Sequence, residues 1–501
     1  MALLVRREYF KPSAARLEEA ALRVGPGAEF YAVSMGGAPI GYRSVTVDTT
    51  AEGLRVQDLT VMDIAVLGTV QRTQIVVDVR LTRALRLRSF VGTFDAPGAA
   101  FRASGTVEGD SVLPVTIEAG GRPQVTRVRL QRPIVMTSLL PLQLAFGHQL
   151  APGREFAVPL FDPMAMEERA ATVRVLAEST LTVPDSARRD SAAQRWVPAH
   201  IDTLRAWKVA EAYGGVETES WIDRQGRVVR AVSPVGFRLD RMPFEMAVEN
   251  WRRSAEARGA AGGAGGDIVA ATAITANVPL VPHDLEVLRV VIGDAALAGL
   301  DLAGGRQSLA GDTLVVRRET GVGGPGKGPA LYEARLPLVD TALAADLAPE
   351  PLVQSDDPRI EAQARQVLGR ERRAGPAAEL LVRWVHDNLK KEITISVPSA
   401  VQVLDERRGD CNEHTVLYVA LARAVGLPAR TAAGLVYLRG RFYYHAWPEV
   451  WLGEWVAVDP TFGQFPADAS HLRFVIGGLA RQLELLRLIG RVHVAVVGGG
   501  R

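Results

Sequence analysis

Alternation of apolar and polar positions dominates the chain from about residue 30 to about residue 249. Short runs of this kind are separated by Gly-Gly, Asp-Pro and Glu-Gly-Asp turn signals, and they include FYAVSM, SVTVDTT, TQIVVDVRLT, SVLPVTIEA, QVTRVRL and ATVRVLAE. Such alternation is typical of antiparallel strands with one buried face and one face in water. The segment WIDRQGRVVRA, with its polar bend, predicts a β-hairpin. We therefore predict a β-rich domain over residues 28–253.

The pattern changes twice beyond this region. Residues 254–267 read SAEARGAAGGAGGD, a small-residue and glycine-rich composition that predicts a flexible linker. Alternation resumes in LEVLRVVIG, DTLVVRRE and ALYEARLPLV, which predicts a second, smaller β-rich domain over residues 268–348. In residues 349–501, DDPRIEAQARQVLGRE and GPAAELLVRWVHDNLKK place apolar residues at helical spacing. The chain is thus predicted to be multidomain, with β-rich domains followed by an α+β domain.

The first residues have a pattern of their own. Residues 1–27 begin MALLV, continue with Arg6 and Arg7, and then read as an amphipathic helix. This order resembles the tail of an apolar segment followed by its basic flank. One hypothesis is that the gene start lies upstream and encodes a membrane anchor, and the alternative is a ragged N-terminus. No stretch of the given chain approaches the roughly 20 apolar residues that a membrane-spanning helix needs.

Length and charge narrow the possibilities further. A chain of 501 residues is too long for one hydrophobic core, so several domains are expected. Lys and Arg number 58 and Asp and Glu 56, and this balance gives no reason to expect a nucleic-acid partner. Cys411 is the single cysteine, which excludes an intrachain disulfide and any multi-cysteine metal cluster.

A glycine-rich segment imitates a nucleotide site. Residues 321–328, GVGGPGKG, match the first seven places of the P-loop pattern, but Gly328 stands where the pattern needs Ser or Thr for magnesium. The flanking segments both read as strands, whereas a phosphate-binding loop is followed by a helix. The segment is therefore predicted to be a hairpin loop, and no cofactor is expected.

The run RGDCNEHTVLYVALARAVGLP carries the most informative pattern. Its apolar residues predict a buried helix that ends at Gly426 and Pro428. Asp410 and Glu413 have the spacing of a capping box, which places Cys411 in the first helical turn. Free backbone N–H groups and the positive end of the helix dipole favour an anion there. We therefore predict a reactive thiolate with a lowered pKa, beside N–H groups that form part of an oxyanion hole.

Three successive strands joined by tight turns are predicted between residues 430 and 459. With a bend at residues 452–454, His445 and Asp459 fall on neighbouring strands in nearly opposed register. Side chains on one face of such a hairpin can form a hydrogen bond. Packing of the helix on this sheet would bring Cys411 to His445. The predicted roles are Cys411 as nucleophile, His445 as base and Asp459 as the carboxylate that orients the base.

These motifs resemble those of a known family. Gly-Asp-Cys at a helix start, ALARAVGLPAR, a His-Ala-Trp-Pro-Glu-Val-Trp strand and a Trp-Val-Ala-Val-Asp-Pro strand are similar to the transglutaminase-like superfamily of papain-like thiol enzymes, over roughly residues 350–480. The resemblance implies a papain-like fold in residues 349–501, with Cys411, His445 and Asp459 as the catalytic residues. It also implies a peptidase, amidase or acyltransferase that acts on protein or peptide amides through a thioester.

The resemblance bears on the rest of the chain as well. The β-rich region is similar to accessory domains found ahead of such catalytic domains in bacterial proteins. Many proteins of this architecture are held outside the cytoplasmic membrane, which agrees with the suspected anchor. Three side chains are candidates for the second oxyanion donor, namely Asn412, Gln402 and Trp447, and the pattern does not choose among them.

Two other functions compete with this interpretation. A non-catalytic binding or scaffold protein could retain the three residues as architecture, with the β-rich region as its working part. Cys411, His414 and His445 could instead bind a catalytic metal, although such a mixed set makes a poor structural zinc site. We expect no metal, because the cysteine, histidine and aspartate motifs occur together and in order.

Overall fold

The structure is a computed structural model that describes most of the chain from residue 26 onward. The residues outside the description are 1–25, 67–68, 98, 110, 131–135, 137–138, 148, 163–166, 214–215, 262–268, 270–271, 294–296, 320–328, 395 and 501. The predicted N-terminal helix and the glycine-rich loop therefore lie almost wholly outside the described residues. The same holds for the second half of the predicted linker.

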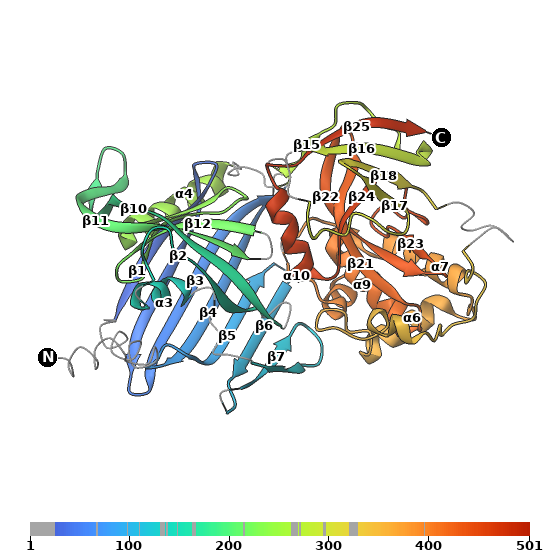
Figure 1. The fold of residues 1–501 in the computed structure, drawn as a ribbon, viewed down its shortest axis with the longest axis horizontal. Coiled ribbons are helices and arrows are strands. Elements are labelled where there is room, and N and C mark those ends of the chain that lie inside the picture. The colour runs from blue at the N-terminus through green and yellow to red at the C-terminus, as the bar shows by residue number, and fades with distance from the viewer. Residues whose placement is uncertain are drawn as a thin grey trace. The chain divides into compact units, whose positions relative to one another are not determined.

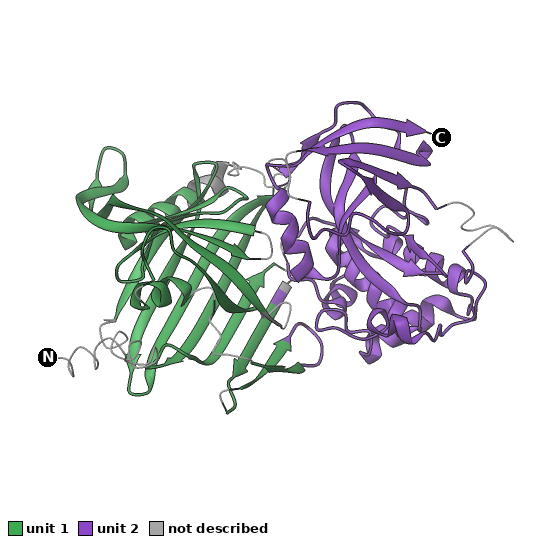
Figure 2. Cartoon of the chain, viewed as in Figure 1, with its two compact units in different colours: residues 1–97, 101–117, 124–267 green, residues 98–100, 118–123, 268–501 purple. Residues whose placement is uncertain are grey.

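The chain divides into two compact units (Figure 2). Unit 1 comprises residues 1–97, 101–117 and 124–267, and unit 2 comprises residues 98–100, 118–123 and 268–501. The main boundary coincides with the end of the predicted linker. The first part of that linker is helical, because α4 extends over Asn250–Ala261.

Unit 1 is built on one 14-stranded sheet (Figure 1). Its strand order is β8-β7-β6-β5-β4-β3-β2-β1-β14-β13-β12-β11-β10-β9, and every pair with a described register is antiparallel. The predicted hairpin is confirmed, since β12 pairs with β13 across the polar bend. The strands are β1 (Gly27–Met35), β2 (Ala38–Thr50), β3 (Gly53–Val66), β4 (Thr69–Thr82), β5 (Leu87–Ala96), β6 (Ala99–Thr106), β7 (Val112–Glu118), β8 (Gln124–Arg129), β9 (Glu155–Asp162), β10 (Glu167–Asp190), β11 (Arg195–Tyr213), β12 (Val216–Asp223), β13 (Val228–Val232) and β14 (Phe237–Arg241).

This sheet curves and encloses a core. The rings of Phe90 on β5 and Phe161 on β9 lie 5.9 Å apart, although their strands are far apart in the sheet order. Helix α3 (Leu140–Phe146) covers part of the concave face, where Leu140 and Leu144 join a core with Val209 and other residues of β10–β12. The buried side of the alternating pattern is therefore the inside of the curve.

Unit 2 has three layers: helices, a five-stranded sheet and a four-stranded sheet (Figure 1). One core lies between the helices and the five-stranded sheet, and a second lies between the two sheets. The five-stranded sheet has the order β15-β22-β21-β24, with β23 also paired to β22, and the other has the order β17-β18-β16-β25.

Unit 2 contains α-helices, strands and short 3₁₀-helices among its described residues. The helices are α6 (Pro358–Leu368), α7 (Ala374–Asn388), α8 (Ala400–Glu406), α9 (Cys411–Ala424) and α10 (Leu479–Gln482). The strands are β15 (Ile274–Thr275), β16 (Val287–Gly293), β17 (Gln307–Ala310), β18 (Thr313–Arg317), β21 (Ala429–Leu438), β22 (Arg441–Trp451), β23 (Trp455–Ala457), β24 (His471–Ile476) and β25 (His493–Gly500). Two short strands, β19 (Lys390–Lys391) and β20 (Arg408–Gly409), pair with each other in parallel.

The structure corrects the predicted separate domain over residues 268–348. Strand β16 pairs with β25 from the end of the chain, with Val290 opposite Val496, and Leu288 shares a core with Leu435 of β21. This segment therefore completes unit 2 and has no core of its own. The stretch ALYEARLPLV, which was predicted to be a strand, forms turns and a single bridge between Arg335 and Arg373.

The predicted helices of unit 2 are confirmed. Helix α6 begins after Asp357, whose carboxylate accepts the backbone N–H of Arg359 at 2.9 Å. Helix α9 ends just before Gly426, which adopts a φ of +77° that favours glycine. None of the helices in the described residues is long and apolar enough to cross a membrane.

Candidate active site

Cys411 occupies the first turn of α9. The Asp410 carboxylate accepts the backbone N–H of Asn412 at 2.9 Å, and the Glu413 carboxylate accepts the backbone N–H of Asp410 at 2.9 Å. This reciprocal pair is the predicted capping box, and it fixes where the helix begins. Gly409 precedes it with a φ of +153°, and a Cβ there would lie 2.3 Å from the Glu413 side chain. The cap therefore depends on a glycine before it.

His445 and Asp459 meet on the adjacent sheet. Strands β21 and β22 are joined by Arg439 and Gly440, both with positive φ, as a tight two-residue hairpin requires. Strand β22 then pairs with β23, and Asp459 follows two residues after β23 ends. Nε2 of His445 lies 2.8 Å from Oδ2 of Asp459, and both side chains are buried. The predicted hydrogen bond is present.

The thiol of Cys411 lies close to this pair. Cys411 packs against the core that contains Ala446, the residue after His445, and the backbone N–H of Ala446 lies close enough to the sulfur to lower its pKa. The sulfur is also near enough to Asp459 for that charge to affect its pKa. The structure thus gathers the three predicted residues where the start of α9 meets β22.

All the acceptor positions of Asp459 are used. Oδ1 accepts the backbone N–H groups of Thr461 at 2.7 Å and Phe462 at 3.0 Å, while Oδ2 lies within hydrogen-bond distance of both His445 and His471. Burial alone would raise the pKa of Asp459, but the charges and hydrogen bonds of the two histidines outweigh it and hold that pKa well below its usual range. Asp459 is therefore ionised at any physiological pH.

His471 is a member of the site that the sequence interpretation missed. Its Nε2 lies 3.0 Å from Asp459, and its Nδ1 lies 3.2 Å from Oδ1 of Asp468. Burial would lower the pKa of His471, but the hydrogen bonds to the two carboxylates outweigh it and raise that pKa to about 9. His471 is thus a buried imidazolium at neutral pH. The available signal was a histidine and an aspartate next to the buried run LRFVI.

Close packing of β24 on β21 makes this contact possible. Gly434 lies opposite His445 in the β21–β22 pair, and a Cβ on it would approach the carbonyl oxygen of Leu472 to 1.9 Å. A larger residue would push β24 away. Glycine at this position therefore allows His471, which precedes Leu472, to reach Asp459.

Aromatic rings hold the imidazole of His445 in place. Phe462 stacks on it with centroids 5.0 Å apart and planes 16° apart, and Trp447 stacks with centroids 6.0 Å apart. Stacking together with the bond to Asp459 restricts rotation of the ring. Trp447 also has a buried indole N–H for which the described residues provide no hydrogen-bond acceptor. Gln402, another candidate oxyanion donor, already donates its Nε2 to a backbone carbonyl at 2.8 Å.

The electrostatics of the thiol differ from the sequence-based expectation. Burial raises the pKa of Cys411 well above its usual value, and the neighbouring Asp410 raises it further, whereas the N–H of Ala446 lowers it only partly. This direction is opposite to that of the predicted low-pKa thiolate, and its main cause is burial of the thiol, which an argument from the helix dipole alone leaves out. A raised thiol pKa favours the protonated form of the sulfur.

Alkylation of Cys411 by iodoacetamide tests this point. We expect slower reaction near pH 7.5 than for a free cysteine of ordinary pKa about 8.5, with the rate still rising above about pH 9. Burial also raises the pKa of Asp410 well above its usual value, so Asp410→Asn, which keeps a capping side chain, should accelerate alkylation only at a pH where that carboxyl is ionised. Glu361→Gln, an exposed change on α6, is the control and should leave the rate unchanged. Rapid alkylation below pH 7 would contradict the raised pKa.

Two groups of side chains bear on the metal alternative. His414, one of the suggested ligands, places its Nδ1 2.6 Å from the backbone oxygen of Asp410, and its buried Nε2 has no hydrogen-bond partner among the described residues. The ligand atoms of His445, Asp459 and His471 do lie within 4.8 Å of one another. However, the N–O separations of 2.8 and 3.0 Å are shorter than the roughly 3.3 Å expected between ligands around a tetrahedral zinc. His445 and His471 are each hydrogen-bonded to Asp459.

A thiol at a helix start, beside a hydrogen-bonded imidazole and carboxylate on a sheet, places this unit among the papain-like thiol-enzyme folds. Residues 361–460 match the transglutaminase-like superfamily. The chain therefore carries a transglutaminase-like domain, as the sequence motifs indicate.

Solved structures offer remote similarities. The chain is similar to a proposed cysteine protease from Cytophaga hutchinsonii, with 16% identity over 42% of this chain and 83% of that one and a TM-score of 0.28. It is also similar to a β-barrel-like protein of unknown function from Brucella abortus, with 14% identity over 44% of this chain and 95% of that one and a TM-score of 0.32. No curated protein matches the chain.

Proposed function

We propose that this protein is a thiol enzyme that attacks amide bonds of protein or peptide substrates through a thioester on Cys411. The observation that supports this most is the buried hydrogen bond between His445 and Asp459 beside the Cys411 thiol. Such a chain of nucleophile, base and orienting carboxylate is the arrangement that activates a weakly acidic nucleophile.

The reaction proceeds in two halves. His445 accepts the thiol proton while the sulfur of Cys411 bonds to the amide carbonyl carbon, and the backbone N–H of Cys411 stabilises the oxyanion. His445 then returns the proton to the leaving amine as the C–N bond breaks and the thioester remains. Water or a second amine attacks the thioester and regenerates the thiol. Hydrolysis, deamidation and cross-linking differ only in which amine leaves and which acceptor enters.

The raised pKa of the thiol assigns a specific role to His445. Because the proton stays on sulfur at rest, His445 must act as a general base during the attack. Its Nε2 is committed to Asp459, so Nδ1 is the nitrogen left to accept the thiol proton. Asp459 therefore selects the tautomer that the chemistry needs.

Trapping of the acyl-enzyme tests the proposal. We expect incubation with a mixture of glutamine-containing peptides, followed by acid quenching, to give a mass adduct on the Cys411 peptide. Cys411→Ala removes the adduct, and His445→Ala should reduce its rate of formation by at least about 100-fold. His200→Gln, which changes an exposed histidine on β11, is the matched control and should behave as wild type.

One observation favours a second candidate function, a scaffold that retains the three residues. A partly buried thiol with a raised pKa is also what an inert structural cysteine would show. Absence of any adduct, with identical behaviour of wild type and His445→Ala, would favour the scaffold.

A further inference from the structure

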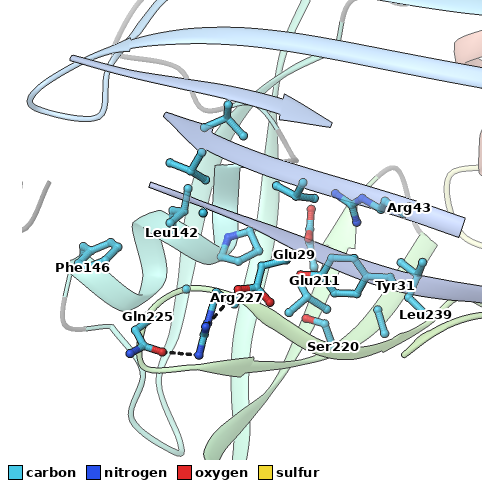
Figure 3. A pocket seen from close by; sticks show the side chains of 18 of the residues that line it. Glu29, Tyr31, Arg43, Leu142, Phe146, Glu211, Ser220, Gln225, Arg227 and Leu239 are labelled. Atoms are coloured by element: carbon cyan, nitrogen blue, oxygen red, sulfur yellow. Dashed lines mark hydrogen bonds and ion pairs between the residues drawn. The ribbon is translucent and has the colours of Figure 1, made fainter. Parts of the chain in front are cut away.

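Unit 1 contains a cavity of about 440 Å³, far along the chain from the proposed active site. This volume lies within the range of about 300–1,000 Å³ that is typical of small-molecule sites. The cavity lies against α3 and the strands β1, β2, β3 and β11–β14 (Figure 3). Its lining is mainly apolar, with Val45, Val47, Leu142, Phe146 and Leu239 among the residues that form it.

Strand register explains why these side chains converge. Directly opposed residues of antiparallel strands point to the same face of a sheet. Glu29 lies opposite Val45, and Tyr31 lies opposite Arg43, so β1 and β2 present alternate residues to the cavity. The same rule places Glu211 of β11 on the concave face, because its cross-strand neighbours include Val173 and Thr218. The cavity is therefore a consequence of the alternating pattern of the whole sheet.

Most charges around the cavity are balanced in pairs. Arg43 donates to Asp58 at 2.8 Å. Arg227 donates to Glu29 at 3.1 Å and to Asp223 at 2.8 Å, and Arg241 donates to Asp223 at 2.9 Å. These three arginines are thus matched by three carboxylates. Figure 3 shows the bond between Arg227 and Glu29 at the wall of the cavity.

Among the described residues, Glu211 is the carboxylic acid on the cavity wall that is not paired with an arginine. It follows Trp207 and Val209 on the same face of β11, and both of those side chains are buried in the apolar core beneath α3. No hydrogen bond or ion pair joins Glu211 to any of the described residues. Burial raises the pKa of Glu211 to about 7. The other titratable groups on the cavity wall are Glu29, Tyr31, Arg43 and Arg227, and the arginines among them are already paired.

We propose that this cavity binds a small amphipathic molecule with an apolar body and a single cationic ammonium group, and that Glu211 is the residue that receives the cation. A carboxylate without a partner at the edge of an apolar cavity is costly unless it is neutralised. A ligand ammonium would supply the missing charge and a charge-assisted hydrogen bond. An alkyl or aromatic body would cover the valine and leucine walls. This site is independent of the thiol chemistry of unit 2.

Calorimetric titration with three probes of equal chain length tests the proposal. Decylammonium, decanol and decanoate are added to the 501-residue chain below their aggregation concentrations. At about pH 8.5 Glu211 is ionised, and we expect decylammonium to bind roughly 10- to 100-fold more tightly than decanol, with decanoate weakest. At about pH 5.5 Glu211 is neutral while the probe remains cationic, since alkylamines have a pKa near 10.4, so this preference should largely disappear.

Two matched variants test whether Glu211 causes the preference for decylammonium. Glu211→Gln keeps the size of the side chain but should abolish the preference for decylammonium while decanol still binds. Glu217→Gln, on the neighbouring strand and paired with Arg174, should leave the preference intact. Equal binding of decanol and decylammonium by wild type at about pH 8.5, or binding of none of the probes, would overturn the proposal. The wild-type comparison remains decisive even if Glu211→Gln does not fold.

Discussion

Asp459→Asn is expected to lower kcat by about 10⁴-fold while the fold is retained. The reason is the orientation of the new amide. Oδ1 of residue 459 accepts two backbone N–H groups, so the amide oxygen must take that place and the amide NH₂ must face His445 and His471. His445 Nε2 can then only accept, which puts its proton on Nδ1, the nitrogen that should take the thiol proton. A triad with the wrong tautomer loses about this much activity in serine proteases.

The measurement is the rate of thioester formation on Cys411 across pH. The rate of thioester formation should be lower in Asp459→Asn than in wild type at every pH. The circular dichroism spectrum should be unchanged. His471→Gln serves as the graded comparison, because it removes the imidazolium that partly neutralises Asp459. Asp459 keeps its bonds to His445 and to the two backbone N–H groups in this variant, so we expect only about a 10-fold loss of rate. Turnover unchanged in Asp459→Asn would remove Asp459 from the mechanism.

Much of the fold could be predicted from the sequence, because local patterns determine where many of its strands and helices begin and end. Alternation located the strands of unit 1, and the capping box located the start of α9. The failure over residues 268–348 has a physical cause: β16 completes its sheet with β25, about 200 residues later, and such long-range pairing leaves no local mark. The cavity of unit 1 escaped notice for the same reason, since it depends on how distant strands curve toward each other.

The residues of the candidate site fall into the same two groups, those with a local sequence signal and those without one. Cys411, His445 and Asp459 could be predicted because each sits in a motif with a local structural reason. His471 could not, because its role depends on Gly434 letting β24 approach β21. The direction of the thiol pKa could not be predicted because the helix dipole is opposed by burial of the thiol, which is the larger cause, and by the nearby capping residue Asp410. A cap that defines the helix start can thus work against the thiolate it positions.

A buried ion network holds together the sheet that carries the site. Glu449 of β22 accepts Arg430 Nη2 of β21 at 2.6 Å and Arg473 Nη1 of β24 at 2.8 Å. Arg473 also donates to the backbone oxygens of Asp301, Ala303 and Gly304. Glu449 and Arg473 are only 2% and 3% exposed, so solvent screens the network little. One carboxylate therefore joins three strands of the sheet that carries His445 and His471.

Glu449→Ala is expected to destabilise unit 2 by about 3–5 kcal/mol, because it leaves two guanidinium groups without a counter-charge in a buried site. Hydrogen exchange read by mass spectrometry should show faster exchange in peptides from β21, β22 and β24, with unit 1 unaffected. Glu361→Ala breaks an exposed pair with Arg365 on α6 and should cost no more than about 0.5 kcal/mol. If the loss reflects uncompensated charge, replacing Arg430, Glu449 and Arg473 together with apolar residues should restore much of the protection. Unchanged exchange in Glu449→Ala would mean that the strands are held by their backbone ladder and apolar core alone.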